Sequence, residues 1–349
     1  MSAIDPTPEP AKPRAVLALR PDEVPELFGP EALHRLSAAA LVDLDTPVVD
    51  QLAPRTAGAL AEADILLTSW GSPRIDLGFL DAAPKLRLLV HAAGTVKPLV
   101  VPEIFERGVR VCSAAEANAV PVAEYTLAAV ILGAKRAFPA AARYKSGVRA
   151  ADGTHRDLAG LGWIGAWPLT VGVIGASRIG RKVVRLLRAV LDADVLVYDP
   201  YGLGGLDEDP RVRSVELDVL LGACDVVTVH APLTPETRGL LDARRLALLR
   251  DGTVLVNTAR GPIADGPALA RELTSGRIDA VLDVTDPEPL PPESELFDLP
   301  NVFVTPHIAG SLGREVRRLG LLAVGEVERF AAGLPLRYEV FPDQLDRLA

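Results

Sequence analysis

Three polar side chains in the second half of the chain are of types suited to work on a carboxylate or a carbonyl group. Arg260 lies in VNTARG, Glu288 in DPEP and His307 in TPHIAG. Each follows or ends an apolar stretch that predicts a β-strand. A guanidinium pairs with a carboxylate through two parallel hydrogen bonds, and an imidazole oriented by a carboxylate exchanges a proton near neutral pH. The three residues therefore predict a site that binds an acid and moves a proton.

Taken singly, each of these residues also has a simpler interpretation. Arg260 alone predicts a loop arginine, Glu288 a solvated carboxylate in a Pro-rich loop, and His307 a packing residue beside an apolar strand. Their order favours the functional interpretation, because ligands of open parallel sheets bind at the carboxyl ends of the strands.

A glycine-rich turn upstream predicts a dinucleotide site. In VGVIGASRIGRKVVRLL, Gly175 suits a tight turn after a strand and Gly180 suits close packing of the following helix. Ser177 replaces the middle glycine of G-x-G-x-x-G, so its side chain crowds a pyrophosphate slightly, while its hydroxyl is able to donate to it. Asp199 ends the next expected strand, where a carboxylate accepts from ribose hydroxyls and repels a 2′-phosphate. The pattern favours NAD over NADP.

Strand and helix patterns alternate twice along the chain, which predicts two α/β units with parallel sheets covered on both faces. The main expected helices are 30–40, 52–63, 120–138 and 311–333. The expected strands are 15–20, 41–45, 63–70, 86–94 and 109–114 in the first unit, and 170–174, 194–199, 225–230, 253–259, 279–284 and 301–307 in the second.

The fold class expected from this alternation is α/β, with two doubly wound, Rossmann-like or flavodoxin-like domains and a cleft between them. Residues 1–14 are expected to form a flexible tail. A discontinuous substrate domain is expected over 15–118 plus 308–349, because the last helix follows a completed second sheet. Residues 119–307 are expected to form the NAD-binding domain.

Composition excludes several classes of protein. The 349 residues have a net charge of −9 and no basic block, which argues against a nucleic-acid partner. Cys112 and Cys224 are too few for a disulfide framework or a metal site and predict buried structural thiols. No apolar run approaches the roughly 18 residues of a membrane span, so a soluble, cytoplasmic protein is expected. Five positive charges over 135–149 predict a solvated face or a subunit contact.

Together these stretches resemble the NAD-dependent D-2-hydroxyacid dehydrogenase family. The matching segments are VGVIGASRIG, VLVYDP, VHAPLTPETRGL, VNTARGPIAD, DVTDPEPLP and TPHIAGS, with weaker matches in HAAGTVKPLV and AEANAVPVAEYTLA. The resemblance covers roughly residues 60–335 and is strongest over 170–312. It departs at Ser177 and at Thr285-Asp286, where the family often has an aromatic residue and an acid.

The resemblance implies interconversion of a 2-oxo acid and a D-2-hydroxy acid, as in glyoxylate or hydroxypyruvate reductases, by a homodimer. The catalytic residues would be Arg260, Glu288 and His307, and the substrate would bind Arg260 and the backbone of Gly94, Thr95 and Val96. Implied cofactor contacts are Gly175, Ser177, Arg178, Ile179, Gly180, Asp199, His230, Pro232, Thr237, Thr258, Ala259, Asp283, His307 and Gly310.

Other interpretations stay open from sequence alone. A family member acting on formate or phosphite is disfavoured, since formate-type members tend to have Gln at the position of Glu288. A nucleotide-sensing, corepressor-like regulator on the same fold is compatible with the same residues. A Rossmann-like methyltransferase is disfavoured by the ordered Arg, Glu and His. Trp70 and His91 are expected either to line the substrate pocket or to pack in the core, and Asn118 and Glu124 to lie in a hinge.

Overall fold

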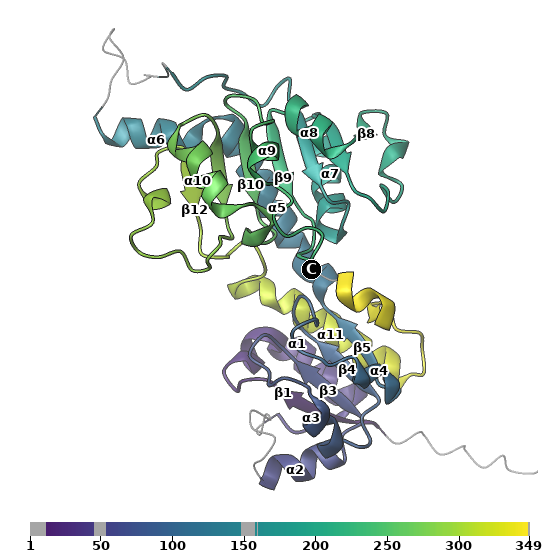
Figure 1. Ribbon diagram of the computed structural model, residues 1–349. Coiled ribbons are helices and arrows are strands. Elements are labelled where there is room, and N and C mark those ends of the chain that lie inside the picture. The colour runs from purple at the N-terminus through teal and green to yellow at the C-terminus, as the bar shows by residue number, and fades with distance from the viewer. Residues whose placement is uncertain (1–11, 45–53, 148–157, 159, 348–349) are drawn as a thin grey trace, which may run out of the picture. The chain divides into compact units, whose positions relative to one another are not determined.

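The computed structural model describes residues 12–44, 54–147, 158 and 160–347 (Figure 1). These residues form two compact units: unit 1 runs to Asn118 and resumes at Leu312, and unit 2 runs from Ala119 to Ser311. From the sequence, the two domain boundaries were expected between residues 118 and 119 and between residues 307 and 308. The expected tail and Arg149 lie outside the described residues, apart from 12–14.

Unit 1 contains a six-stranded sheet in the order β13-β5-β4-β3-β1-β2. The strands are β1 (Arg14–Ala18), β2 (Leu41–Val42), β3 (Ile65–Thr68), β4 (Leu88–His91), β5 (Arg110–Ser113) and β13 (Glu339–Val340). The first five strands are parallel in the flavodoxin-like order 2-1-3-4-5. The sequence did not predict β13, which pairs antiparallel with β5 at the sheet edge.

Helices cover both faces of this sheet. They are α1 (Glu23–Ala39), α2 (Pro54–Ala61), α3 (Leu77–Ala82), α4 (Glu103–Glu106) and α11 (Val316–Ala331). Helices α1 and α11 share one apolar cluster with the strands, while α3 and α4 lie in the cluster on the opposite face. The closing helix α11 thus belongs to unit 1. Its Gly320 permits close packing, since a Cβ there would collide with the carbonyl of Leu27 in α1.

Unit 2 contains a seven-stranded, wholly parallel sheet in the order β12-β11-β10-β9-β6-β7-β8. Its strands are β6 (Thr170–Ile174), β7 (Asp194–Tyr198), β8 (Val212–Ser214), β9 (Val226–Val229), β10 (Val254–Asn257), β11 (Asp279–Leu282) and β12 (Val302–Val304). Numbered within the unit, the order is 3-2-1-4-5-6-7, which places the topological switch point of a Rossmann fold between β6 and β9. The sequence missed β8, a short edge strand.

The unit 2 helices also cover both sheet faces. They are α5 (Ala115–Ala134), which begins in unit 1, α6 (Ala137–Lys145), α7 (Arg178–Val190), α8 (Leu217–Ala223), α9 (Ala243–Leu246) and α10 (Gly266–Thr274). One apolar cluster joins α8, α9 and α10 to the sheet, and the other joins α5 and α7 to the opposite face. Cys112 in unit 1 and Cys224 in unit 2 are free and buried, as predicted, and burial raises the pKa of Cys224 to about 12.

Helix α5 corrects one sequence-based expectation. By length and composition it is apolar enough to cross a membrane, contrary to the expectation that no segment would be. Half of that apolar stretch is buried in the structure, and core helices of soluble proteins pass the same test. Ala129, Val130 and Ala134 of α5 pack in the unit 2 core, which accounts for the apolar composition.

Arg136 corrects two further expectations. The predicted helix 120–138 is broken here, because Arg136 has a left-handed backbone conformation between α5 and α6. The side chain is also buried, so it does not belong to a solvated face or a subunit contact. Its guanidinium pairs with Asp279 at 2.7 Å, donates to the carbonyls of Gly252 and Trp163, and lies over the Trp163 ring.

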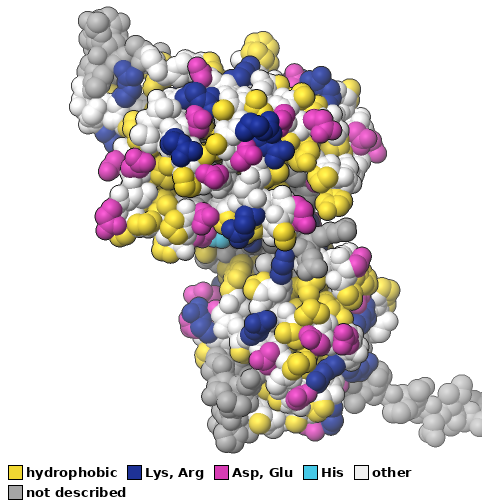
Figure 2. Space-filling model, viewed as in Figure 1, with side chains coloured by type: hydrophobic (Ala, Val, Ile, Leu, Met, Phe, Trp, Pro, Cys, Tyr) yellow, Lys and Arg dark blue, Asp and Glu magenta, His cyan; other side chains and the backbone are white. Residues whose placement is uncertain are grey.

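The charged surface agrees with the composition. On the face shown in Figure 2, Lys and Arg side chains are interspersed with Asp and Glu over both units. No broad field of positive charge is visible on this face.

We expect Arg136→Met to lower the free energy of unfolding by about 3 kcal/mol, because it leaves the Asp279 carboxylate without its cation in a largely buried position. Burial raises the pKa of Asp279, and Arg136 opposes that shift. The difference in stability between wild type and the variant should therefore become smaller as the pH falls through the raised pKa of Asp279, because protonation removes the unpaired charge. Urea unfolding monitored by Trp fluorescence measures both effects.

Lys145→Met is the matched control, since Lys145 is exposed on α6 and its replacement should change stability by less than about 0.5 kcal/mol. Equal stability of the two variants would contradict a structural role for the Arg136 pair.

Candidate active site

The glycine-rich turn lies at the switch point between β6 and β9. Gly175 follows β6 with φ 99° and donates its N–H to the carbonyl of Tyr198 at 2.8 Å. A Cβ on Gly175 would lie 2.8 Å from the backbone of His230 and Ala231, and one on Gly180 would collide with the Gly175 carbonyl. Both predicted glycines are therefore required by close packing of strand, turn and helix.

Ser177 is the N-cap of α7, and its Oγ accepts from the N–H of Gly180 at 3.3 Å. Since the hydroxyl acts as an acceptor here, its proton stays available to a phosphate oxygen. Ser177 was expected from sequence only to crowd or bind a phosphate in place of the usual glycine, and its role as a helix cap was not predicted. Arg178 and Ile179 form the first turn of α7 beside it.

Asp199 connects the end of β7 to the same turn. One carboxylate oxygen accepts from the N–H of Ala176 at 2.6 Å, and the other accepts from the N–H of Tyr201 at 2.8 Å. Each carboxylate oxygen has a second lone pair, so the group is still able to accept from a ribose. Asp199 thus holds the turn in addition to occupying the predicted ribose position.

His230, Pro232 and Thr237 lie in the connection after β9. Burial lowers the pKa of His230 to about 3, so its ring is neutral. Its Nε2 lies 2.9 Å from the hydroxyl of Thr228, while Nδ1 has no partner among the described residues. The Thr237 hydroxyl donates to the Pro232 carbonyl at 2.6 Å, which closes the loop on itself.

Arg260 is carried by a loop that follows β10 and is clamped by Asn257. The Asn257 amide donates to the Arg260 carbonyl at 3.0 Å and accepts from the N–H of Ala259 at 3.1 Å. The Arg260 guanidinium donates to the Ala259 carbonyl at 2.6 Å. The Thr258 hydroxyl lies 3.0 Å from the Thr126 hydroxyl in α5. Burial lowers the pKa of Arg260, and the charge of Glu288 opposes this effect, so the two side chains lie within electrostatic reach.

The loop that carries Glu288 packs directly against the Arg260 loop. A Cβ on Gly261 would collide with the Thr285 carbonyl, so glycine is required where the two loops meet. Glu288 Oε1 lies 2.6 Å from His307 Nδ1. Both side chains are nearly half exposed, at 41% and 47%. The contact orients the ring and leaves Nε2 as the nitrogen available to a substrate.

Asp283 holds the loop that carries His307. The carboxylate is buried and accepts from the Thr305 hydroxyl at 2.6 Å and from the N–H groups of Ile308 and Ala309, each at 2.8 Å. These bonds explain an aspartate that the resemblance implied only as a cofactor contact. Gly310 follows at the end of this loop, beside the buried Ser311.

The predicted substrate turn belongs to unit 1 and follows β4. The Ser113 hydroxyl donates to the Gly94 carbonyl, and the Thr95 hydroxyl accepts from the N–H of Lys97 at 3.3 Å. Val96 is buried, with its carbonyl accepting from the N–H of Leu99. The substrate-binding role of Gly94, Thr95 and Val96 stays a prediction.

His91 and Trp70 differ in their surroundings. His91 is buried, hydrogen bonds to Thr68 at 3.0 Å, and has its pKa lowered to about 4 by burial. These contacts support the packing interpretation. Trp70 is 54% exposed, so it is not a core residue.

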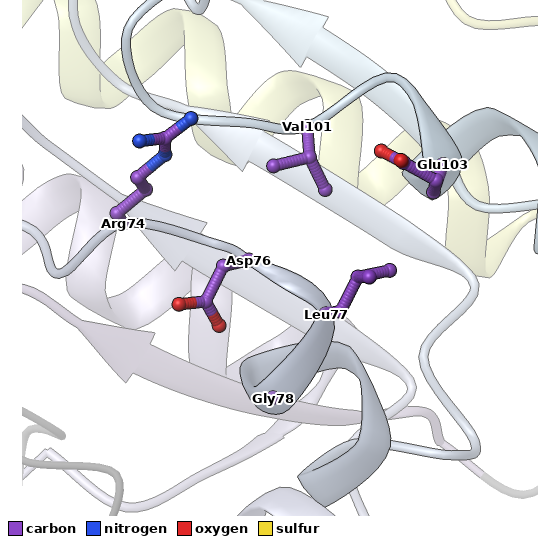
Figure 3. A pocket seen from close by; sticks show the side chains of 6 residues that line it. All are labelled: Arg74, Asp76, Leu77, Gly78, Val101 and Glu103. Carbon is purple, nitrogen blue, oxygen red and sulfur yellow. The ribbon is translucent and has the colours of Figure 1, made fainter.

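Unit 1 also has an open hollow of about 320 Å³ lined by Arg74, Asp76, Leu77, Gly78, Val101 and Glu103. Figure 3 shows Leu77 and Val101 between Arg74 at one end and Glu103 at the other. Asp76 accepts from the N–H of Phe79 and so caps α3. The hollow includes none of the predicted site residues.

The structure thus brings Glu288 into contact with His307 and places Arg260 within reach of Glu288's charge. Sequence reasoning missed Asn257 and Thr305, whose hydrogen bonds hold the loops that carry Arg260 and His307. Their positions in the sequence could have indicated them, because Asn257 is the last residue of β10 and Thr305 directly follows β12.

Comparison with known proteins agrees with this geometry. Residues 129–309 match the family described as D-isomer specific 2-hydroxyacid dehydrogenase, NAD binding domain. D-3-phosphoglycerate dehydrogenase of Archaeoglobus fulgidus is 34% identical over 76% of this chain and 49% of its own length. Glyoxylate reductase of Thermofilum pendens is 32% identical over 72% of this chain and 73% of its own length.

Among solved structures, a D-isomer specific 2-hydroxyacid dehydrogenase from Xanthobacter autotrophicus, in complex with NADPH and MES, superposes with a TM-score of 0.71. It is 27% identical, and the match covers 96% of this chain and all of that one. The chain spans about half the length of the phosphoglycerate dehydrogenases it matches. The family match, the Rossmann strand order and the paired Glu288 and His307 lead to one conclusion: the chain belongs to the D-isomer specific 2-hydroxyacid dehydrogenases, with a domain that binds a nicotinamide cofactor.

Proposed function

We propose that this protein is an NAD-dependent dehydrogenase that interconverts a small 2-oxo acid and a D-2-hydroxy acid. The observation that carries the proposal is the 2.6 Å contact between His307 Nδ1 and Glu288 Oε1. Glu288 follows β11, which pairs with β10, the strand that precedes Arg260, and His307 follows β12, the next strand beyond β11. The pair therefore supplies a proton donor beside a cation at the edge of the sheet where ligands bind.

His307 would act as the general acid in reduction of the oxo acid. Because Glu288 occupies Nδ1, the proton transferred to the substrate oxygen comes from Nε2, and the carboxylate stabilises the imidazolium before transfer. The reverse reaction uses the neutral ring as the base. The bound nicotinamide supplies the hydride chemistry.

Arg260 would bind the substrate and polarise its carbonyl group. One terminal nitrogen is used by the Ala259 carbonyl, which leaves further N–H groups of the planar guanidinium for a carboxylate or carbonyl oxygen. The partial burial of Arg260 strengthens such bonds because less water competes for the guanidinium.

We propose NAD rather than NADP because Asp199 presents a carboxylate at the end of β7, directly against the phosphate turn. A 2′-phosphate there would meet a negative charge. We also propose a cytoplasmic homodimer. Large apolar side chains of unit 2 are exposed, which supports a subunit contact; they include Leu132, Ile164, Trp167 and Phe303.

The function is tested with a panel of 2-oxo acids, from glyoxylate and hydroxypyruvate to branched and aromatic acids, by monitoring NADH oxidation. Wild type should reduce at least one of them, and His307→Asn should lower kcat about 1000-fold because the general acid is lost. Asn is chosen because it tolerates the left-handed backbone of His307. NADH binding, followed by nucleotide fluorescence, should fall only slightly by comparison. Full turnover in the variant would contradict the assignment.

Glu288→Gln should shift the alkaline fall-off of reduction to lower pH, because the imidazolium loses the charge of its carboxylate partner. Oxidation of the hydroxy acid needs the neutral ring, so its acidic limb should move to lower pH as well. Profiles of kcat/KM against pH in both directions measure the effect. Identical profiles for wild type and variant would show that Glu288 does not tune His307.

Wild type should prefer NADH to NADPH, and Asp199→Asn should shift the ratio of kcat/KM values about tenfold toward NADPH, because the carboxylate charge is removed. The amide oxygen still accepts from the N–H of Ala176, which keeps the contact with the phosphate turn, while the bond from the N–H of Tyr201 is lost. Asp207→Asn, at an exposed position in the same connection, is the control. A wild-type preference for NADPH would refute the role of Asp199.

A further inference from the structure

His307 has a left-handed backbone conformation with φ 55°, which a non-glycine residue adopts only where its surroundings hold it. Its N–H donates to the carbonyls of Asp283 at 2.9 Å and Thr305 at 3.0 Å. The next two N–H groups, of Ile308 and Ala309, donate to the Asp283 carboxylate. The bonds to Asp283 therefore determine where the imidazole ring is directed.

The direction of the hydrogen bonds around Thr305 follows from a count of protons. Its hydroxyl lies 2.6 Å from the Asp283 carboxylate and 2.7 Å from the Tyr125 hydroxyl. A threonine hydroxyl has one proton and an ionised carboxylate has none, so the Thr305 proton points to Asp283. Tyr125 must then donate to Thr305. Burial raises the pKa of Tyr125, which keeps this proton on the phenol.

Tyr125 is itself held by packing. It lies on α5, and its half-buried ring packs against the unit 2 core. The next residue, Thr126, donates to the Val122 carbonyl and so accepts from Thr258 at 3.0 Å. Two consecutive side chains of α5 therefore bond to the loop that follows β12 and to the loop that carries Arg260.

We propose that Tyr125 is a positioning residue for proton transfer at His307, acting through Thr305 and Asp283. The Tyr125 hydroxyl donates to the Thr305 oxygen and so holds it beside Asp283, whose carboxylate accepts the Thr305 proton and holds the loop. Without the Tyr125 donor, the Thr305 side chain loses one of its two hydrogen bonds, and the loop is held less firmly. The kinetic consequence rests on the proposed function, whereas the effect on the His307 ring does not.

Tyr125→Phe removes one oxygen and keeps the packed ring. We expect kcat for reduction of the oxo acid to fall about tenfold, because the proton donor is less well oriented, while KM for NADH stays the same. Tyr338→Phe in unit 1 is the matched control, since the hydrogen bonds of Tyr338 to Glu326 and Ser113 are made by its backbone. Thr305→Val should show a similar loss, and Thr305→Ser, which restores the hydroxyl, should recover most of it.

The double variant Tyr125→Phe, Thr305→Val should be no slower than Thr305→Val alone, because the two side chains act through one set of bonds. If the fold-losses in kcat of the two single variants multiplied in the double variant, the two side chains would act independently, and this result would overturn the proposal. So would an unchanged kcat in Tyr125→Phe together with a lowered Tm.

A second measurement needs no turnover. The chain has five histidines, and His307→Asn identifies the His307 ring signal in a spectrum of ¹⁵N-histidine-labelled protein. That signal should shift or broaden in Tyr125→Phe and stay in place in Tyr338→Phe. An unmoved signal would refute the proposal. If wild type reduces no oxo acid, the proposed function fails, and the ring signal still decides the role of Tyr125.

Discussion

Parallel pairing of β10, β11 and β12 is the constraint on which the candidate active site depends. Val256 pairs with Val281, and Val281 pairs with Phe303, so the three strands run in step and end at one edge. Neighbouring strands lie about 4.8 Å apart, a spacing that side chains of adjacent loops are able to bridge. The contact between Glu288 and His307 is a direct result of this spacing. The same rule, applied to β6 and β9, brings the glycine-rich turn and the His230 connection together at the switch point.

Strand spacing alone leaves the loops several ångströms of freedom, and short polar side chains remove it. Asn257 bonds to both sides of the Arg260 loop, and Asp283 bonds to three donors around His307. These groups use their hydrogen bonds on the protein's own backbone and hydroxyl groups. Catalytic side chains on loops are held to a fraction of an ångström only where such support exists. The partly exposed His307 ring is thus positioned by the buried carboxylate of Asp283, and the Arg260 loop by the buried amide of Asn257.

The sequence predicted the α/β class and the long strands, since buried parallel strands appear as apolar runs. It missed β8 and β13, because edge strands of two or three residues have no such run. The break at Arg136 was not predictable locally, since it depends on Asp279, 143 residues away. The pairing of Glu288 with His307 was foreseen. The support by Asp283 was not, because an aspartate after a strand has the same pattern whether it faces a ligand or its own loop.

Because unit 2 is inserted between two parts of unit 1, the two cores cannot be completed in chain order. Helix α1 and the first strands are synthesised early, yet Leu27 and Leu36 share their apolar cluster with Leu319 and Val327 of α11. All seven strands of unit 2 leave the ribosome before that helix does. Unit 2 is therefore able to finish folding while an apolar face of unit 1 still faces solvent. During synthesis unit 2 is therefore complete before unit 1, and unit 1, which begins earlier, exposes apolar surface prone to aggregation for longer.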